Sequence, residues 1–171
     1  MTSCLLRLFS LYPRSAWFAA LALGAWGVAI AGLELQHLLR LAPCPYCIFQ
    51  RLLYFVLSIL GVIGFLFPQL ARLWLLLIGG VAGLGALLAA YQSWMQAFPT
   101  LASECSYTDP NFIESFVDWL GMQWPGLFLA TGFCTSKEWV FLGMSMANWS
   151  FLLFAAIVAY ALLLWRHRDS G

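Results

Sequence analysis

Charge is the scarcest property of this sequence. Only 9% of its 171 residues are charged, and the formal net charge is +1, whereas soluble domains carry about 25% charged residues. Hydrophobic residues make up 63% of the chain, and the mean hydropathy is +0.87. A surface so poor in charge suits lipid rather than water, and nothing in the charge balance indicates a nucleic-acid partner. Repeats, low-complexity tracts and linkers are also lacking, so we expect residues 1–171 to form one domain surrounded by membrane lipid.

The few charges are separated by long uncharged segments. Four such gaps divide the chain, namely Arg14 to Glu34, Arg51 to Arg72, Arg72 to Glu104 and Glu138 to Arg166. A membrane helix needs roughly 20 apolar residues. We therefore predict an all-α membrane protein, a four-transmembrane-helix bundle with spans at about 15–33, 49–67, 73–93 and 145–165. Loops at about 34–48 and 94–144 then lie on one side of the membrane, and both termini lie on the other.

The distribution of basic residues predicts the orientation. With both termini inside, five basic residues lie in inner segments: Arg7, Arg14, Arg72, Arg166 and Arg168. Three lie in outer segments: Arg40, Arg51 and Lys137. The richer side is normally cytoplasmic, so we expect cytoplasmic termini and outward-facing loops. A cleaved signal peptide is the alternative, because "AIA" at 29–31 resembles a cleavage site. The outer loops would face outward in either case.

Cysteine is also sparse, but its positions are informative. The chain has five cysteines. Cys4 falls on the inner side, where thiols stay reduced, and we interpret it as an unpaired bystander. The other four fall in the outer loops: Cys44, Cys47, Cys105 and Cys134. An even number of cysteines in an oxidising compartment implies disulfides, and two purely structural disulfides are one interpretation of them.

The stretch "APCPYCIFQR" at residues 42–51 favours a redox role for the first pair. A C-x-x-C ring is too small to stabilise a fold much, and such pairs often serve as exchange dithiols. Cys44 and Cys47 fall where the second span begins, Pro45 suits a first helical turn, and the positive end of the helix dipole favours a thiolate. Arg51 shares a helix face with Cys47. It either snorkels to the headgroups or donates hydrogen bonds to a thiolate or polar ligand.

Metal binding is the other alternative for these cysteines. Structural four-cysteine zinc sites usually combine two close C-x-x-C motifs. Cys105 and Cys134 are instead 29 positions apart, and no histidine lies near either. A c-type haem needs a histidine directly after the second cysteine of the motif, where this chain has Ile48. We therefore dismiss haem, hold zinc as a minor alternative and expect no metal site.

The long outer loop contains a second helical signal. Asp109 is expected to cap a short helix with Pro110 in its first position. Apolar residues follow at helical spacing: Phe112, Ile113, Phe116, Val117, Leu120 and Trp124. Polar residues occupy much of the other side: Glu114, Ser115, Asp118 and Gln123. The segment is too short to span a bilayer. We expect an amphipathic helix that either lies on the membrane surface or packs on the protein's own spans, with Cys105 and Cys134 flanking it.

Taken together, these motifs resemble the disulfide bond formation protein B (DsbB) family of quinone-coupled thiol oxidoreductases. The resemblance rests on "CPYCIFQR" at the mouth of the second span, on a second cysteine pair between spans three and four, and on "GFCTSKEWVFLGMSMANW" leading into the last span. It covers nearly the whole chain, from about residue 10 to 165. It implies a four-helix bundle in the bacterial inner membrane, periplasmic outer loops and a quinone, ubiquinone or menaquinone, bound at the outer edge.

The resemblance also implies a role for each site residue. A periplasmic, thioredoxin-like oxidant (DsbA-like) would attack Cys105 of a Cys105–Cys134 disulfide. Cys134 would then exchange with Cys44, and Cys47 would be freed as a thiolate beside the quinone. Arg51 would polarise a quinone oxygen, and closure of the Cys44–Cys47 disulfide would deliver two electrons to the quinone pool.

Two features depart from the family pattern. Tyr46 stands where an aliphatic residue is common, and the spacing of the loop pair is somewhat long. The alternative function is a non-catalytic four-span membrane protein with two structural disulfides.

Overall fold

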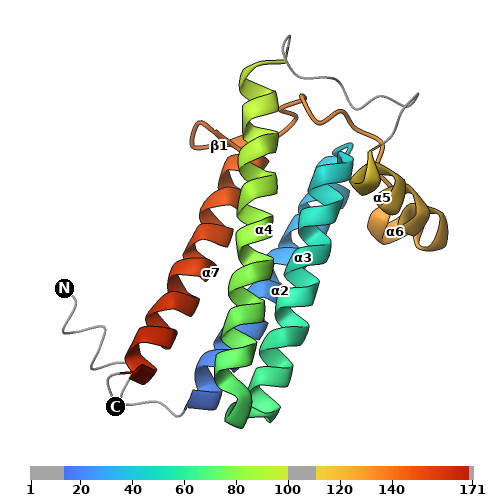
Figure 1. Ribbon diagram of the computed structural model, residues 1–171. Coiled ribbons are helices and arrows are strands. Elements are labelled where there is room, and N and C mark those ends of the chain that lie inside the picture. Colours follow the sequence, from blue (N-terminus) through green and yellow to red (C-terminus); the bar gives the residue numbers. More distant parts are fainter. Residues whose placement is uncertain (1–13, 100–110, 170–171) are drawn as a thin grey trace.

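The computed structural model describes residues 14–99 and 111–169, and four long helices dominate it (Figure 1). These helices are α2 (Arg14–Leu39), α3 (Pro45–Leu66), α4 (Ala71–Ala97) and α7 (Met146–Asp169). Four segments that coincide closely with these helices are long and apolar enough to cross a membrane: Ser15–Leu39, Pro45–Leu66, Pro68–Ala97 and Met146–Arg166. The predicted all-α, four-span bundle is therefore confirmed. In Figure 1 the start of α2 and the end of α7 lie together at the lower end.

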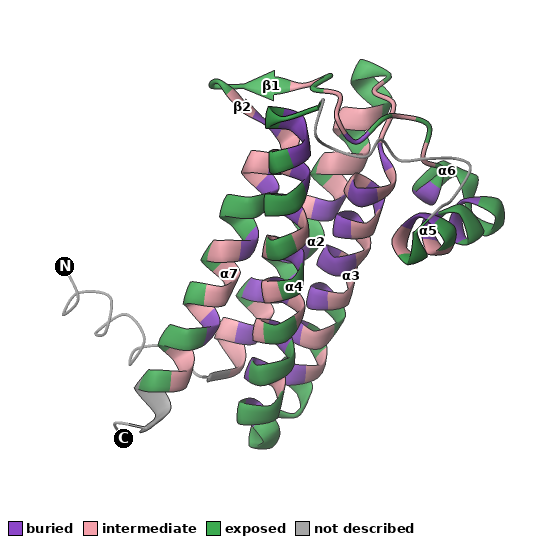
Figure 2. Cartoon of the chain, turned by 45° about the horizontal axis from the view of Figure 1, so that its top comes forward, coloured by how far each residue is buried: buried purple, intermediate pink, exposed green. Residues whose placement is uncertain are grey.

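The outward faces of the four helices are apolar as well as the interior. Figure 2 shows exposed residues along the outer sides of the bundle and buried residues along its axis. Several of the exposed residues are large and aliphatic: Leu23, Ile59, Leu76, Leu87 and Leu162. Such side chains would be unfavourable in water but suit the hydrocarbon core of a bilayer. The burial pattern thus supports the same multi-pass membrane protein as the composition does.

The helices approach each other closely where one of them has a glycine. A Cβ atom on Gly61 of α3 would lie 2.9 Å from the Cβ of Ala22 on α2. A Cβ on Gly85 of α4 would lie 2.5 Å from the ring of Phe154 on α7. That ring is fully buried and stacks on Tyr54, with the ring centroids 4.2 Å apart. Small residues therefore set the helix separation, as is common in membranes.

Replacing Gly85 with valine should destabilise the bundle, because the new side chain has to displace the buried ring of Phe154. Overpacking of this kind costs about 1–3 kcal/mol, and we expect a clearly lower midpoint of thermal unfolding in detergent. Gly83→Val is the matched control, since no atom lies within 4 Å of the added Cβ on the same helix. Equal midpoints for the two variants would contradict the packing described here.

The helices begin and end at backbone signals rather than at the limits of the apolar runs. α2 continues to Leu39 instead of ending near residue 33, and it stops where Arg40 adopts a φ of 51°. α3 begins at Pro45 instead of near residue 49, with Cys44 as its N-cap. The connection between them is therefore much shorter than the predicted loop at 34–48. At the other end, a single turn of 3₁₀ helix, η1 (Pro68–Leu70), joins α3 to α4.

The segment between α4 and α7 carries the remaining elements. They are two helices, α5 (Phe112–Gln123) and α6 (Pro125–Phe128), and two short strands, β1 (Val140–Phe141) and β2 (Met144–Ser145). The strands pair antiparallel through a two-residue turn in which Leu142 and Gly143 have φ values of 53° and 78°. Two positive φ angles are typical of the tight turn of a β-hairpin. This hairpin was not predicted from the sequence.

The start of α5 differs from the sequence-based prediction. The helix begins at Phe112, with Asn111 as N-cap, rather than at Pro110 after Asp109, a pair that lies outside the described residues. Asn111 accepts a hydrogen bond from the Glu114 amide at 3.0 Å, and the Glu114 carboxylate accepts one from the Asn111 amide at 2.9 Å. This capping box needs an acidic residue three positions after the cap, and Asp109 lacks one. Glu114, predicted on the polar outer side, is consequently buried.

The second of the two predicted arrangements describes α5 better. Val117 and Leu120 of α5 are buried against Ile48 of α3, so the helix packs on the protein's own second span. Several large side chains of the segment nevertheless remain exposed: Phe112, Trp119, Met122 and Trp124. The short helix predicted in the long loop thus exists, and it lies beside the start of α3 (Figure 1).

Candidate functional site

The C-x-x-C motif forms the first turn of α3. Cys44 is the N-cap, and its sulfur accepts a hydrogen bond from the Cys47 backbone amide at 3.4 Å. Pro45 occupies the first helical position, where no backbone donor is needed. Because one helical turn separates the two cysteines, their side chains meet, and the Cys44 Sγ donates to the Cys47 Sγ at 2.9 Å. Cys44 and Cys47 are thus placed to open and close a disulfide without rearrangement of the helix.

Burial affects how readily the Cys44 thiol loses its proton. Cys44 is 2% exposed. Burial raises the pKa of the Cys44 thiol well above its ordinary value, and its hydrogen bonds with Cys134 and Cys47 act in the same direction. Cys44 therefore keeps its proton and acts as the donor, while the Cys47 sulfur receives hydrogen bonds at the positive end of α3. This asymmetry agrees with the expectation that Cys47 is the thiolate.

The loop before α7 brings a third cysteine to this pair. Cys134 is 2% exposed and lies against Cys44, with which it makes a side-chain hydrogen bond. The backbone amides of Thr131 and Gly132 both donate to the carbonyl oxygen of Pro43, at 3.0 and 3.1 Å. The chain around Cys134 is therefore fixed directly onto the loop that precedes Cys44. Cys105, the predicted disulfide partner of Cys134, lies outside the described residues, as does Cys4.

Three further hydrogen bonds hold the Cys134 loop over the bundle. Glu138 accepts a hydrogen bond from the Ala42 amide at 2.7 Å. Gln96 of α4 donates to the Ser136 carbonyl at 3.1 Å and accepts from the Ser145 hydroxyl at 2.6 Å. The loop is thus attached to the start of α3, to α4 and to the hairpin.

Gly132 has no space for a side chain in this arrangement. A Cβ atom there would overlap the carbonyl oxygen of Ala42. We expect Gly132→Ala to push the loop away from Cys44 and to slow disulfide exchange between Cys134 and Cys44 about tenfold, because overpacking against backbone costs about 1–3 kcal/mol. Rapid acid quenching followed by mass spectrometry of the cysteine peptides would measure the exchange.

The matched control for this variant is Gly126→Ala in α6, where the added Cβ meets nothing within 4 Å. If Gly132→Ala exchanged as fast as Gly126→Ala, the close approach of Gly132 to Ala42 would have no part in aligning the two sulfurs.

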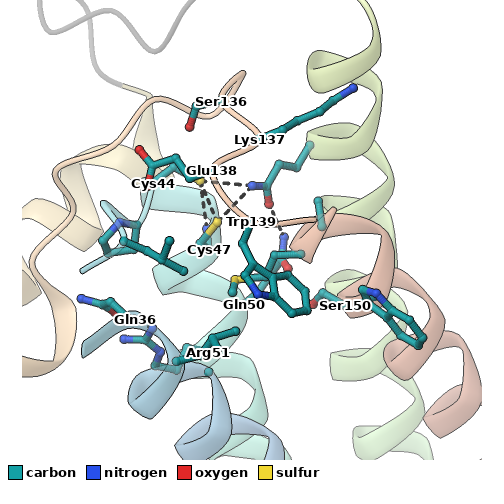
Figure 3. A pocket seen from close by; sticks show the side chains of 18 of the residues that line it. Gln36, Cys44, Cys47, Gln50, Arg51, Ser136, Lys137, Glu138, Trp139 and Ser150 are labelled. Atoms are coloured by element: carbon teal, nitrogen blue, oxygen red, sulfur yellow. Dashed lines mark hydrogen bonds between the residues drawn. The ribbon is translucent and has the colours of Figure 1, made fainter. Parts of the chain in front are cut away.

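A cavity of about 290 Å³ opens beside the dithiol (Figure 3). Cys44 and Cys47 line it, together with mostly apolar side chains of α2 and α7. Lys137, Glu138 and Trp139 of the Cys134 loop cover it. The cavity is therefore an apolar chamber with the two sulfurs in its wall, and the third sulfur, that of Cys134, touches Cys44.

Arg51 lies in the same cavity one helical turn after Cys47. Its side chain is 7% exposed. One guanidinium nitrogen, Nη2, donates to the Gln36 side-chain oxygen at 2.7 Å, and the other, Nη1, donates to the Leu127 carbonyl oxygen at 3.0 Å. An arginine has five N–H donors, so these contacts fix the side chain and leave donors for a ligand. This geometry favours the ligand-donor interpretation of Arg51 over the snorkelling one.

Two glutamines of the site were not predicted as functional residues. Gln50 donates to the Gln92 side-chain oxygen at 2.8 Å, and Gln92 donates to the sulfurs of Cys44 and Cys47 at 3.2 and 3.0 Å. Both are buried within membrane spans. A polar side chain inside a span is costly unless it has a partner, and this signal could have identified Gln92 in the otherwise apolar sequence of α4.

Tyr46, which stands where the family motif commonly has an aliphatic residue, also has a contact. Its hydroxyl oxygen accepts a hydrogen bond from the Asn111 side chain at 3.1 Å. Because Asn111 caps α5, the C-x-x-C turn is joined directly to the N-cap of that helix.

Comparison with known proteins identifies the family of this chain. The family described as "Disulfide bond formation protein DsbB" matches residues 13–164. A protein named disulfide bond formation protein B from Dechloromonas aromatica is 60% identical over 157 residues, covering 92% of this chain and 95% of the relative. Proteins of the same name from Albidiferax ferrireducens and Nitrosomonas europaea are 38% and 37% identical, covering 87% and 89% of this chain and 86% and 93% of the relatives.

Proposed function

Because this chain belongs to the disulfide bond formation protein B family, we propose that it is a membrane thiol:quinone oxidoreductase. It reoxidises a soluble, thioredoxin-like dithiol oxidant of the DsbA type and passes two electrons to quinone. One observation carries the proposal: Cys134 contacts Cys44, Cys44 contacts Cys47, and Cys44 and Cys47 line an apolar cavity that also contains Arg51. The three sulfurs form a continuous path from an outer loop to a ligand chamber.

The chemistry begins at the outer loop. A thiolate of the reduced partner attacks Cys105 of the Cys105–Cys134 disulfide, and Cys134 leaves as a thiolate. The partner's second thiol then resolves the mixed disulfide, so the partner is oxidised and Cys105 and Cys134 are reduced. Cys134 next attacks Cys44 of the Cys44–Cys47 disulfide, and Cys47 leaves as a thiolate. When Cys105 displaces Cys44, the loop disulfide is restored and the Cys44–Cys47 dithiol remains.

The last step closes the Cys44–Cys47 bond. Forming this disulfide removes two electrons and two protons from the dithiol, and a quinone supplies the matching chemistry by taking up both as it becomes quinol. Cys47 holds the reacting thiolate, Cys44 supplies the second sulfur, and Arg51 donates hydrogen bonds in the cavity.

The residues around the cavity fit a quinone. A quinone has a planar ring with two carbonyl acceptors and an apolar tail, so it needs apolar walls and a hydrogen-bond donor. The cavity offers apolar side chains from α2 and α7, such as Val28 and Leu153, and the free donors of Arg51. Ubiquinone and menaquinone share these features, and we propose that either can serve.

The orientation of the bundle in the membrane decides in which compartment each step takes place. We propose that the protein lies in the bacterial inner membrane with cytoplasmic termini, as the basic residues favour. The cysteine-bearing loops then face the periplasm, where the soluble partner is found. The exposed aromatic side chains of α5, such as Trp119, are suited to the adjoining membrane interface.

The direct test mixes the purified protein with a reduced thioredoxin-like dithiol protein and a quinone and follows quinol formation by absorbance. We expect quinol to form in step with oxidation of the partner, one quinol per dithiol. If no thioredoxin-like dithiol gave quinol, the enzyme proposal would be wrong.

The rival proposal is a non-catalytic membrane protein with two structural disulfides. Thiol trapping in cells depleted of quinone separates the two. Structural disulfides would remain oxidised, whereas the proposed catalytic cysteines would accumulate as thiols. Metal analysis of the pure protein tests the zinc alternative.

A further inference from the structure

The buried amide pair Gln50–Gln92 connects α3 and α4 at the level of the dithiol. The two side chains are 4% and 2% exposed, and neither carries a charge. A structural role alone would require only that their hydrogen-bonding groups be satisfied. The pair goes further, because the Gln92 NH₂ group faces two sulfurs rather than a backbone acceptor.

The orientation of the Gln92 amide is fixed by Gln50. The Gln50 Nε2 donates to the Gln92 Oε1 at 2.8 Å, so the oxygen of Gln92 points to Gln50 and its NH₂ group points away. If the Gln92 amide turned over, two NH₂ groups would face each other and an oxygen lone pair would face the sulfurs. With Gln50 as the donor of this bond, Gln92 is held in the orientation in which its NH₂ group donates to the dithiol.

The sulfurs need such a donor for a physical reason. A thiolate is the reactive form in disulfide exchange, and an apolar environment disfavours a charged group that lacks hydrogen bonds. Gln92 lies 3.0 Å from the Cys47 sulfur and 3.2 Å from that of Cys44, and the Cys44 thiol donates to Cys47 at 2.9 Å. Hydrogen bonds to a charged group are stronger than those between neutral groups, enough to decide which form of Cys47 prevails.

We propose that Gln92 is a catalytic residue that holds Cys47 as the reactive thiolate, and that Gln50 is the positioning residue that aims its amide. This inference rests on the proposed function, since it assigns the groups that prepare the dithiol for oxidation. The electrons and protons still leave the dithiol as the Cys44–Cys47 bond forms and still pass to quinone. The glutamines change how readily the reduced pair exists as a thiol and a thiolate, and they exchange no electrons themselves.

The test measures the dithiol alone, with no quinone and no partner protein. The full-length reduced protein in detergent is treated with iodoacetamide at a fixed neutral pH, and tandem mass spectrometry follows alkylation of Cys47. We expect Gln92→Met to slow this alkylation about tenfold, because the loss of one hydrogen bond to a charged group is of that size. Gln50→Met should slow it by about threefold, although Gln50 does not contact the sulfurs.

The equilibrium between the Cys44–Cys47 disulfide and its reduced dithiol gives a second readout. A donor that stabilises the thiolate stabilises the reduced pair, so its loss should make the Cys44–Cys47 disulfide harder to reduce. For Gln92→Met we expect about a tenfold shift in a dithiol redox buffer, which corresponds to about 30 mV for a two-electron couple. Ser58→Ala is the control, because Ser58 is another buried polar residue of α3 and its hydroxyl donates to the Ala22 carbonyl, far from the sulfurs.

The double variant Gln50→Met/Gln92→Met distinguishes an effect on the reactivity of Cys47 from an effect on the stability of the protein. Each single variant leaves one buried amide without its partner, which costs stability, whereas replacing both partners with apolar groups of similar shape can be nearly neutral. We expect the double variant to recover most of the thermal stability but to keep the slow alkylation of Cys47. If alkylation returned to the wild-type rate together with stability, the pair would have only a structural role and the inference would be overturned.

Failure of quinol formation in the wild-type protein would instead contradict the proposed function, and it would leave these measurements on the dithiol unaffected.

Discussion

Replacing Cys47 with serine should abolish quinol formation and leave Cys44 joined to Cys134 in a disulfide between the two outer loops. Serine cannot form the Cys44–Cys47 bond, so the step that releases electrons to quinone is lost. Removal of a catalytic nucleophile commonly costs on the order of 10³-fold or more. Cys44 keeps its contact with Cys134, however, and can still attack that sulfur. The variant should therefore stop at the intermediate in which the loops are cross-linked.

Non-reducing peptide mapping by mass spectrometry would detect this cross-link. The complementary variant, Cys44→Ser, should show no disulfide between the outer loops, because Cys44 is the cysteine of the pair that bonds with Cys134. Cys4→Ser should leave turnover at the wild-type rate. A Cys47→Ser protein that accumulated a Cys105–Cys134 disulfide and no Cys44–Cys134 cross-link would show that the order of the three sulfurs is wrong.

Replacing Arg51 with alanine should raise the quinone concentration needed for half-maximal rate by about 10- to 100-fold, since a charge-assisted hydrogen bond contributes about 1.5–3 kcal/mol. The substitution removes the guanidinium that Gln36 and Leu127 hold in the cavity. Exchange between the partner protein and Cys105 should not change, because it takes place in the outer loop. Initial rates over a range of ubiquinone and menaquinone concentrations, with mixed-disulfide formation measured in parallel, would separate the two effects.

Two controls make the Arg51 result specific. Arg72→Ala changes the net charge equally, but Arg72 lies at the start of α4, at the opposite end of α3 from the cavity. Arg51→Lys keeps the charge and loses the planar fork of donors, so it should fall between wild type and Arg51→Ala. An unchanged quinone dependence in Arg51→Ala would remove Arg51 from the site.

The sequence predicted the features that depend on local pattern. The uncharged gaps gave the four spans because a bilayer imposes a minimum apolar length. The pairing of Cys44 with Cys47, and the position of Arg51 on the same face, followed from helical spacing alone. The boundaries were less accurate, since hydropathy marks where apolar residues end, while Arg40 and Cys44 end and begin helices through backbone geometry and capping.

The features that were missed depend on contacts between distant segments. Gln92 and Cys44 are 48 positions apart, and the amide of Ala42 meets the carboxylate of Glu138 across 96 positions. No spacing rule connects such residues before the helices are assembled. The cap of α5 was misplaced for a different reason: Asp109 and Asn111 are both good N-caps, and only the reciprocal bond with Glu114 selects Asn111.

The depth of the cavity has a consequence for the movement of protons. No charged residue follows Arg51 within α3, and none follows Arg72 within α4. Beyond Tyr54 the bundle interior is filled with apolar side chains such as Leu57 and Ile78. Proton relays through membranes use chains of titratable groups, and the described residues of α3 and α4 beyond Tyr54 form no such chain. Under the proposed function, the protons released by the thiols and those consumed by quinone would then enter and leave on the same outer face. Turnover would carry no net charge across the bilayer, and the membrane potential would neither drive nor oppose it.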